Sequence, residues 1–241
     1  MAADAVVLAG GLGTRLRDVT GGRLPKVLVP VLGRPFIDYK LRSLFMLGVR
    51  RVVISVGEAA DQVVEHVGDG DRFGIAVAYS HDGATLRGTA GAIKHALPML
   101  PAVFWVTYGD TLVEAPLDSI ERDFLARPDV NAVMTVLENV DQWEPSNVDL
   151  RDGRVVNYTK NSPIGTHRWI DYGLLCFRSQ VFESVDIETP TDLRSVIEPL
   201  IQRSQLMAAP VQERFWEVGT PTSLQSTEEH FARTSMWERL S

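Results

Sequence analysis

The chain has little of what marks a secreted, membrane-bound or nucleic-acid-binding protein. Its single cysteine, Cys176, lies in an apolar run, so a disulfide within the chain is excluded and a buried, inert thiol is expected. No apolar stretch approaches the length of a membrane span, and no N-terminal stretch combines a basic region with a long apolar core. We therefore expect a cytoplasmic protein with no membrane partner.

Positive charge is also scarce, since 24 Lys and Arg residues stand against 31 Asp and Glu residues, a net charge of −7. A protein that binds nucleic acid generally carries a basic face, so this balance argues against a nucleic-acid partner. Any anion site must therefore be local. The 241 residues, of which 45% are hydrophobic, suffice for one large α/β domain with a sizeable core.

The most informative stretch lies near the N-terminus, where a short apolar run ends in glycines. A buried parallel strand has this pattern when it feeds a loop that approaches a ligand closely. Backbone N–H groups of such a loop bind anionic oxygens, while Arg15 grips phosphate with its planar fork and Lys26 adds a point charge. The residues that we expect at this polyphosphate site are Leu8, Ala9, Gly10, Gly11, Gly13 and Thr14. A tight turn with solvated basic residues is the alternative.

Two familiar glycine motifs do not fit this loop. The dinucleotide fingerprint requires a glycine at its sixth position, where the chain has Leu16. The P-loop requires a lysine directly after a glycine, and none of these glycines is followed by one. What remains is the string G-G-x-G-T-R-L, followed by L-P-K at Lys26.

The rest of the chain alternates strand-like and helix-like segments. Buried strands are predicted over 51–56, 75–80, 103–107 and 132–138, and helices over 35–47, 59–67, 118–127 and 192–206. The Asp152-Gly153 pair between two alternating segments predicts a hairpin. Strands separated by helices favour βαβ units and a mostly parallel sheet, whose ligands bind at the carboxyl ends of the strands.

Two further segments carry candidate ligand-binding residues. Gly88, Thr89 and Ala90 open a helix whose free N–H groups and small side chains suit a base or a ribose, and an ordinary helix cap is the alternative. Asp110 follows the strand 103–107 almost directly, where an unpaired buried carboxylate is too costly. Mg²⁺ prefers one or two carboxylates with phosphate oxygens and water, so Asp110 is the first candidate metal ligand. A structural aspartate satisfied by neighbouring N–H groups is the alternative.

The order of these motifs resembles that of the sugar-nucleotide pyrophosphorylases, the nucleotidyltransferases that join a nucleoside triphosphate to a sugar 1-phosphate. The resemblance runs from Val6 to Pro221 and closes on the string F-W-E-V-G-T-P. The chain departs from the family pattern at several positions, among them Tyr108 for an asparagine and Glu217 for an aspartate. Within the family, the chain is most similar to heptose-1-phosphate guanylyltransferase-like members.

The resemblance implies a Rossmann-like, GT-A-like fold of three α/β/α layers around a mixed, mostly parallel sheet. It implies one nucleotidyltransferase domain over residues 1–241, with no appended domain. The nucleotide-binding part would span about 1–115 and the sugar-phosphate-binding part about 116–225.

The resemblance also implies roles for individual residues. Arg15, Lys26 and Lys160 would be catalytic, and Asp110 and Glu217 would bind Mg²⁺. The nucleotide would lie over the glycine loop and over Gly88, Thr89, Ala90 and Tyr108, and the sugar would lie beside Asn147, Asp171 and Gly173. A solvated surface lysine at position 160 and a turn-capping aspartate at position 171 are the alternatives.

The implied reaction transfers a nucleotidyl group from a nucleoside triphosphate, with GTP preferred, to a heptose- or cyclitol-type 1-phosphate and releases pyrophosphate. Two alternatives stay open. One is an enzyme of the same fold with a non-sugar acceptor such as phosphocholine, and the other is a non-catalytic nucleotide-sensing subunit. The chain is compatible with a homo-oligomer, and the sequence gives neither the base, nor the acceptor stereochemistry, nor the oligomeric state.

Overall fold

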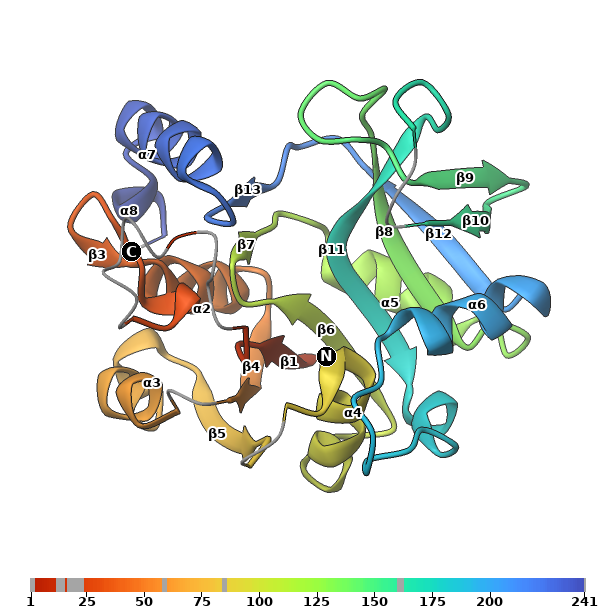
Figure 1. Ribbon diagram of the computed structural model, residues 1–241, viewed down its shortest axis with the longest axis horizontal. Coiled ribbons are helices and arrows are strands. Elements are labelled where there is room, and N and C mark those ends of the chain that lie inside the picture. Colours follow the sequence, from red (N-terminus) through yellow and green to blue (C-terminus); the bar gives the residue numbers. More distant parts are fainter. Residues whose placement is uncertain are drawn as a thin grey trace.

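A nine-stranded sheet runs through the described part of the chain, which comprises residues 3–11, 16, 24–57, 60–83, 86–159 and 163–240 of a computed structural model (Figure 1). In sheet order its strands are β5 (Ala76–His81), β4 (Val49–Val56), β1 (Ala3–Leu8), β6 (Val103–Tyr108), β11 (Trp169–Arg178), β8 (Ala132–Glu138), β12 (Leu206–Val211), β10 (Arg154–Tyr158) and β9 (Val148–Arg151). Two short ribbons pair separately, β2 (Pro30–Val31) with β3 (Arg34–Pro35) and β7 (Thr111–Leu112) with β13 (Trp216–Glu217).

Strand direction divides this sheet into two halves. Strands β5, β4, β1 and β6 are all parallel, whereas β11 runs antiparallel to both of its neighbours, β6 and β8. Beyond β8, only β12 is parallel to its neighbour, and β9 also pairs with β11, so the second half closes on itself. The sheet is therefore mixed, and the expected parallel pairing dominates only the N-terminal half, because the second half is built around a hairpin and an antiparallel central strand.

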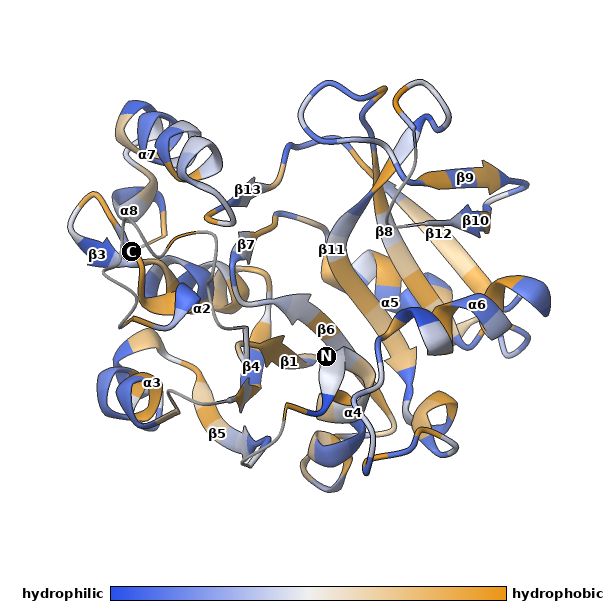
Figure 2. Ribbon diagram, viewed as in Figure 1, coloured by the Kyte–Doolittle hydropathy of each residue, from blue (hydrophilic) through white to orange (hydrophobic). Residues whose placement is uncertain are grey.

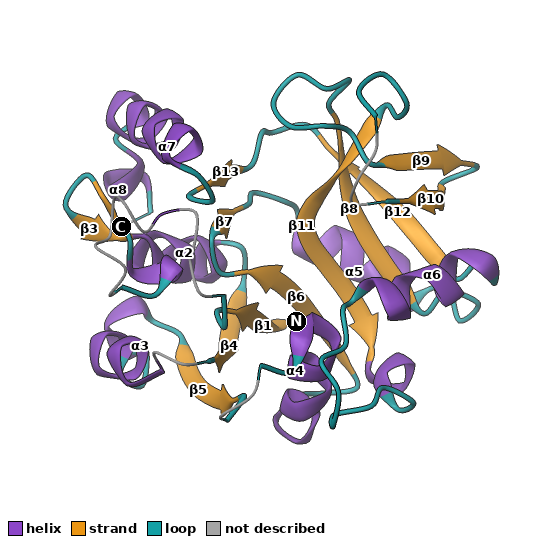
Figure 3. Cartoon of the chain, viewed as in Figure 1, coloured by secondary structure: helices purple, strands orange, loops and turns teal. Residues whose placement is uncertain are grey.

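Helices cover both faces of the sheet (Figure 3). They are α2 (Phe36–Met46), α3 (Ala60–Val67), α4 (Gly88–Ala96), α5 (Leu117–Leu125), α6 (Arg194–Gln202), α7 (Pro221–Thr234) and α8 (Met236–Arg239), with 3₁₀ turns at Lys26–Leu28, Asp71–Phe73, Leu97–Met99 and Ser179–Phe182. The buried side chains of α2, α3 and α5 share one core with one face of the strands, and those of α4 and α6 share a second core with the other face. Successive strand residues alternate between these cores, as period-two side-chain geometry requires.

A third core joins the C-terminal helices to α2. Phe36 and Tyr39 of α2 pack against Phe231 of α7, and Met236 of α8 is buried in the same cluster. The strands of the sheet are mostly hydrophobic, whereas the helices carry hydrophilic residues alongside hydrophobic ones (Figure 2). No helix in the described ranges has both the length and the apolar character that crossing a membrane would need.

Most of the predicted elements are present, and one is wrong at its end. Strand 132–138 is confirmed as β8, and the Asp152-Gly153 hairpin is confirmed with φ values of 51° and 74°, as a type I′ turn requires. The helix predicted over 192–206 ends at Gln202, and the following residues form β12, which the sequence pattern did not reveal. Cys176 is confirmed as buried, and burial raises the pKa of its thiol.

Candidate functional site

The glycine loop and the predicted metal ligand leave the sheet side by side. Strands β1 and β6 are parallel neighbours with Leu8 opposite Tyr108, so the segments that follow them emerge at the same edge. The N–H of Gly109 donates to the Leu8 carbonyl at 2.9 Å. A Cβ on Gly109 would lie 2.6 Å from Val27 Cγ1 and 3.0 Å from the Leu8 carbonyl oxygen, so only glycine lets the two segments approach this closely.

A cavity of about 280 Å³, here called the first pocket, opens at this edge. The sequence-predicted residues that line it are Leu8, Ala9, Gly10, Gly11, Lys26, Gly88, Thr89, Tyr108 and Asp110. The lining residues that sequence reasoning missed are Val27, Ser55, Asp82, Leu86 and Ala92. Six separate stretches of chain, from the ends of β1, β4, β5 and β6, from the 3₁₀ turn at Lys26–Leu28 and from the start of α4, therefore meet around one space.

Asp82 is the most informative of the residues that sequence reasoning missed. It follows β5 directly, is only 5% exposed and accepts a hydrogen bond from Ser55 Oγ at 3.4 Å. Burial raises the pKa of its carboxyl group, and hydrogen bonds from Ser55 and the Arg87 backbone oppose that rise. A signal was available, because Asp82 stands just after a predicted parallel strand, as Asp110 does.

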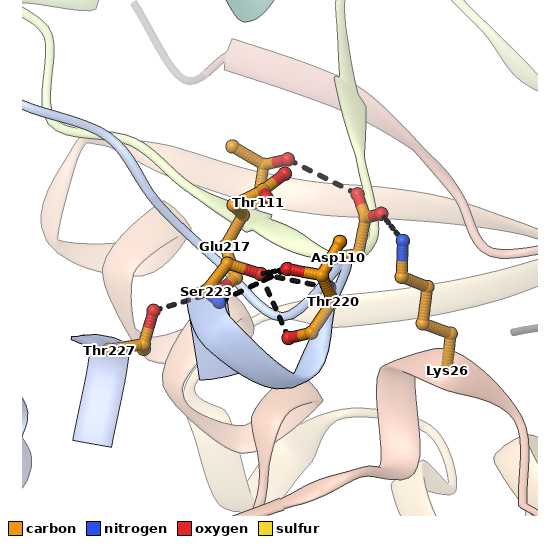
Figure 4. A network of polar contacts seen from close by, with 7 residues as sticks. All are labelled: Lys26, Asp110, Thr111, Glu217, Thr220, Ser223 and Thr227. Atoms are coloured by element: carbon orange, nitrogen blue, oxygen red, sulfur yellow. Dashed lines mark hydrogen bonds and ion pairs between the residues drawn. The ribbon is translucent and has the colours of Figure 1, made fainter. Parts of the chain in front are cut away.

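Charged groups from three segments meet beside Asp110 (Figure 4). Lys26 Nζ pairs with Asp110 Oδ2, and Thr111 Oγ1 donates to Asp110 Oδ1 at 3.1 Å. Glu217 is brought to the same place because β13 pairs with β7, which puts Glu217 opposite Thr111. A Cβ on Gly219 would lie 3.2 Å from both Glu217 carboxylate oxygens and 3.3 Å from Lys26 Nζ, so the lysine and the glutamate converge there.

The electrostatics of this cluster favour a cation. Burial raises the pKa of Glu217, and repulsion from Asp110 and Glu144 raises it further. A carboxylate destabilised by neighbouring negative charge gains from a positive group beside it, and Lys26, which pairs with Asp110, opposes the rise at Glu217. Within the described residues, no group of three or more His, Cys, Asp or Glu side chains is arranged to hold a metal ion. The pair Asp110 and Glu217 nevertheless fits Mg²⁺, which uses one or two carboxylates together with phosphate oxygens.

A second cavity, of about 260 Å³ and here called the second pocket, lies on the other side of Tyr108. It is lined by Tyr108, Thr111, Glu144, Asn147, Tyr158, Ile170, Asp171, Tyr172, Gly173, Phe215, Glu217 and Thr220. Tyr108 lines both pockets, and the carboxylate cluster contributes Asp110 to the first pocket and Glu217 to the second. The three predicted acceptor residues, Asn147, Asp171 and Gly173, therefore share one cavity next to the charged cluster.

The backbone around Asp171 fixes the position of its carboxylate. The N–H of Asp171 donates to Asn147 Oδ1 at 2.9 Å, and the N–H of Gly173 donates to Asp171 Oδ1 at 2.9 Å. Gly173 has a φ of +80°, and the register of β11 against β8 shifts at this point. Tyr158 Oη donates to Asp171 Oδ2 at 3.4 Å, and burial together with the Asp171 charge raises the pKa of Tyr158. Asp171 thus caps a turn and also lines the second pocket.

Tyr108 stays a neutral phenol between the two pockets. Burial raises its pKa above the ordinary value, and the charges of Asp171, Asp192 and Asp110 act in the same direction. The departure from asparagine at this position therefore places an uncharged ring where the pockets adjoin.

One predicted residue is not at the pocket, and several lie outside the described residues. Ala90 is fully buried in the second core, and its N–H donates to the Thr191 carbonyl at 2.8 Å. The Gly91 N–H donates to the same carbonyl at 3.3 Å, so the expectation of free N–H groups at the start of α4 is wrong for both residues. The predicted site residues outside the described ranges are Gly13, Thr14, Arg15 and Lys160.

The fold and the site together define an α/β protein with two adjoining pockets at the carboxyl edge of its sheet. The chain belongs to the nucleotidyl transferase family, whose model matches residues 4–234. It is 31% identical over 223 residues to a glucose-1-phosphate thymidylyltransferase of Streptomyces griseus, and the match covers 88% of this chain and 61% of that protein. The chain thus spans about three fifths of the length of that relative.

Two further relatives match over nearly their full length. A D-glycero-alpha-D-manno-heptose 1-phosphate guanylyltransferase of Campylobacter jejuni is 24% identical over 218 residues, covering 90% of this chain and 95% of that protein. The crystal structure of HddC from Yersinia pseudotuberculosis complexed with GMP-PN is 25% identical and superposes with a TM-score of 0.80, covering 95% of this chain and 99% of that one.

Proposed function

We propose that this protein transfers a nucleotidyl group from a nucleoside triphosphate to a sugar 1-phosphate, releasing pyrophosphate. The observation that carries the proposal is the pair of adjoining pockets with Lys26, Asp110 and Glu217 at their junction. Two substrates that exchange a phosphoryl-linked group need two cavities and a charged cluster where their phosphates meet. Membership of the nucleotidyl transferase family supports the same reaction.

The first pocket would hold the triphosphate, with its phosphates at the Lys26 end. Asp82 would then lie beside the nucleobase, at the end of the pocket away from the phosphates. Its strand, β5, is three strand spacings from β6, or about 14 Å at the usual spacing. A carboxylate accepts well from two adjacent donors, and guanine offers N1–H beside its N2 amino group. Uracil and thymine instead flank one N–H with two carbonyl oxygens, which repel a carboxylate. The Asp82 carboxylate therefore favours GTP, and the guanylyltransferase among the relatives agrees with this preference.

The second pocket would hold the acceptor, with its hydroxyl groups donating to Asp171. A heptose- or cyclitol-type 1-phosphate fits the polar lining that Asn147, Glu144 and Asp171 provide. Thr111 and Thr220 face the same cavity near Glu217. We place the nucleotide-binding part of a single domain at about 1–115 and the sugar-phosphate-binding part at about 116–225.

The chemistry needs no general base, because a sugar phosphate is already ionised at neutral pH. An oxygen of the acceptor phosphate forms a bond to the α-phosphorus, the bond from the α-phosphorus to the bridging oxygen breaks, and pyrophosphate leaves with the electron pair. Lys26 neutralises charge on the phosphates, and Arg15 is proposed to do the same. Mg²⁺ bound by Asp110 and Glu217 would supply further charge neutralisation during transfer. A cytoplasmic location, where nucleoside triphosphates are abundant, completes the proposal.

The test is magnesium-dependent pyrophosphate release with each nucleoside triphosphate against a panel of hexose, heptose and cyclitol phosphates and phosphocholine. Release with GTP and one sugar phosphate, lost in Asp110→Asn, is the expected result. Release only with phosphocholine would replace the acceptor class. Tight triphosphate binding with no turnover across the panel would instead support a nucleotide-sensing subunit and contradict the proposed reaction.

A further inference from the structure

A lysine side chain is completely buried beneath the junction of the two pockets. Lys40 lies on α2 and has no exposed surface. Burial lowers its pKa to about 7, and the charge of Asp110 opposes that fall. Burying an amine is costly unless its N–H groups find acceptors, so the acceptors that Lys40 contacts indicate its role.

The Lys40 nitrogen holds both ends of the turn that carries Asp110. It donates to Thr107 Oγ1 at 2.7 Å and to the Thr111 carbonyl. Thr107 lies on β6 just before Tyr108, and Thr111 directly follows Asp110, so the two acceptors bracket Tyr108, Gly109 and Asp110. A neutral amine keeps two N–H groups, so both hydrogen bonds persist in either protonation state.

Each of the two threonines that accept from Lys40 is in turn hydrogen-bonded toward one pocket. Thr107 Oγ1 donates to the Gly173 carbonyl at 2.9 Å, and the N–H of Gly173 donates to Asp171 Oδ1 at 2.9 Å. On the other side, Thr111 Oγ1 donates to Asp110 Oδ1 at 3.1 Å. One buried nitrogen is thus linked to Asp110 in the first pocket and to Asp171 in the second.

We propose that Lys40 is a positioning residue that fixes the Asp110 turn relative to the Asp171 turn, and so sets the spacing between the two bound substrates. A group transfer loses rate steeply when its reactants are displaced by about 1 Å, so the spacing matters more for turnover than for binding of either substrate alone. The expected effect on turnover rests on the proposed function. The hydrogen-bonded link from Lys40 to the two turns, here called the bracing, does not.

The chain offers a matched control on the same helix. Ser43 is buried one turn further along α2, and its Oγ donates to the Val113 carbonyl at 3.2 Å. It ties α2 to the same segment, two residues beyond Thr111, without touching the Asp110 turn. Ser43→Ala therefore removes a buried hydrogen bond of similar kind and leaves the two turns braced.

The bracing is tested on the free protein by hydrogen exchange of backbone amides. In Lys40→Met, exchange over 108–111 and at 173 should be at least about 10-fold faster than in the wild type, and Thr107→Val should accelerate exchange at 173. Ser43→Ala should leave both segments unchanged. If Lys40→Met does not fold, Thr107→Val decides alone. Unchanged exchange in Thr107→Val, or equal acceleration by Ser43→Ala and Lys40→Met, would overturn the inference.

The kinetic arm uses the substrate pair found active with the wild type. Lys40→Met should lower kcat about 100-fold, while the Kd of the triphosphate measured without acceptor stays within about threefold. The double variant Lys40→Met/Thr107→Val should be no slower than Lys40→Met, because both changes break one linkage. Ser43→Ala should keep the wild-type kcat. Additive losses of kcat in the double variant, or an unchanged kcat in Lys40→Met, would overturn the inference. A wild type that is inactive with every substrate pair would contradict the proposed function, and hydrogen exchange alone would then test the bracing.

Discussion

At the scale of single residues, the site depends on charged groups that the sheet holds at its carboxyl edge. Asp82 and Asp110 each follow a parallel strand, and Glu217 arrives on a short ribbon from the far end of the chain. Ser55 donates to Asp82, and Thr111 donates to Asp110. Partly or fully buried carboxylates with few donors can receive ligand donors or cations, which is the property that the proposed reaction uses.

Substituting Asp82 should change the choice of base. In Asp82→Asn, kcat/KM for GTP should fall about 10- to 100-fold, because the proposed bidentate contact to guanine is replaced by an amide that presents only one acceptor. The kcat/KM values for the other triphosphates should change less. Steady-state rates with four nucleoside triphosphates measure this, and Ser55→Ala, which removes only a donor to Asp82, should have a smaller effect. A variant that kept the full preference for GTP would show that another residue recognises the base.

Burial of Lys40 should make stability depend on pH. Its pKa is about 7 in the folded protein and about 10.5 in the unfolded chain, so the unfolded state binds more protons between these values. The free energy of unfolding should therefore rise with pH above 7, by up to about 1.4 kcal/mol per pH unit from this group. Urea unfolding at pH 7 and pH 9 would measure the rise, and Lys40→Met should lack this contribution. An equal rise in Lys40→Met would assign the pH dependence to other groups.

At the scale of elements, local dihedral demands explain both what was predicted and what was missed. The Asp152-Gly153 turn joins β9 to β10 because both residues take positive φ. By contrast, β12 carries two alanines and Pro210, which are weak strand formers. It is a strand because β8 pairs with it along its whole length, from Leu206 to Val211. Tertiary pairing thus overrode a local pattern that extended the preceding helix.

Replacing Gly153 should destabilise the protein without altering the pockets. The residue has a φ of 74° and open space around its Cβ position, so Gly153→Ala adds backbone strain and no clash. We expect a loss of about 1–2 kcal/mol in the free energy of unfolding. Chemical denaturation measures the loss, with Asp152→Asn as a near-neutral control, because asparagine tolerates the left-handed conformation well. A Gly153→Ala variant as stable as wild type would mean that the turn changes type at little cost.

At the scale of the whole molecule, the two expected parts share one sheet and both main cores. Strand β11 pairs with β6 on one side and with β8 on the other, so the two halves of the sheet share their central strand. Both main cores contain side chains from both halves. In the second core, for example, Val106 and Leu175 are both completely buried. The sheet therefore connects the two pockets through its shared strands.

A fragment of residues 1–115 should therefore fail to fold alone. It would expose the edge of β6 that pairs with β11 and the apolar residues that face the second half. Near-ultraviolet circular dichroism and urea titration should show no cooperative transition for the fragment, against a single transition for the 241-residue chain. A cooperatively unfolding fragment would instead make the N-terminal part a domain of its own.

The sequence by itself determined the features whose causes are local. A hydrophobic run that ends in glycines, a carboxylate close behind a buried strand and an Asp-Gly turn each follow from burial or from dihedral preference over a few residues. Hence most strands, the hairpin and the positions of Gly10 and Asp110 were predictable from local patterns, whereas Asp171 was placed by the family resemblance, which was visible in the order of the motifs.

Only the tertiary structure decided which distant residues meet. Asp82 lines the first pocket because β5, β4, β1 and β6 lie in that order in the sheet, and Glu217 approaches Asp110 because β13 pairs with β7. Lys40 falls within the helix predicted over 35–47, and packing buries it completely against Thr107 and Thr111. Strand order, register and helix packing set these contacts, and they arise from burial summed over the whole chain rather than from any short pattern.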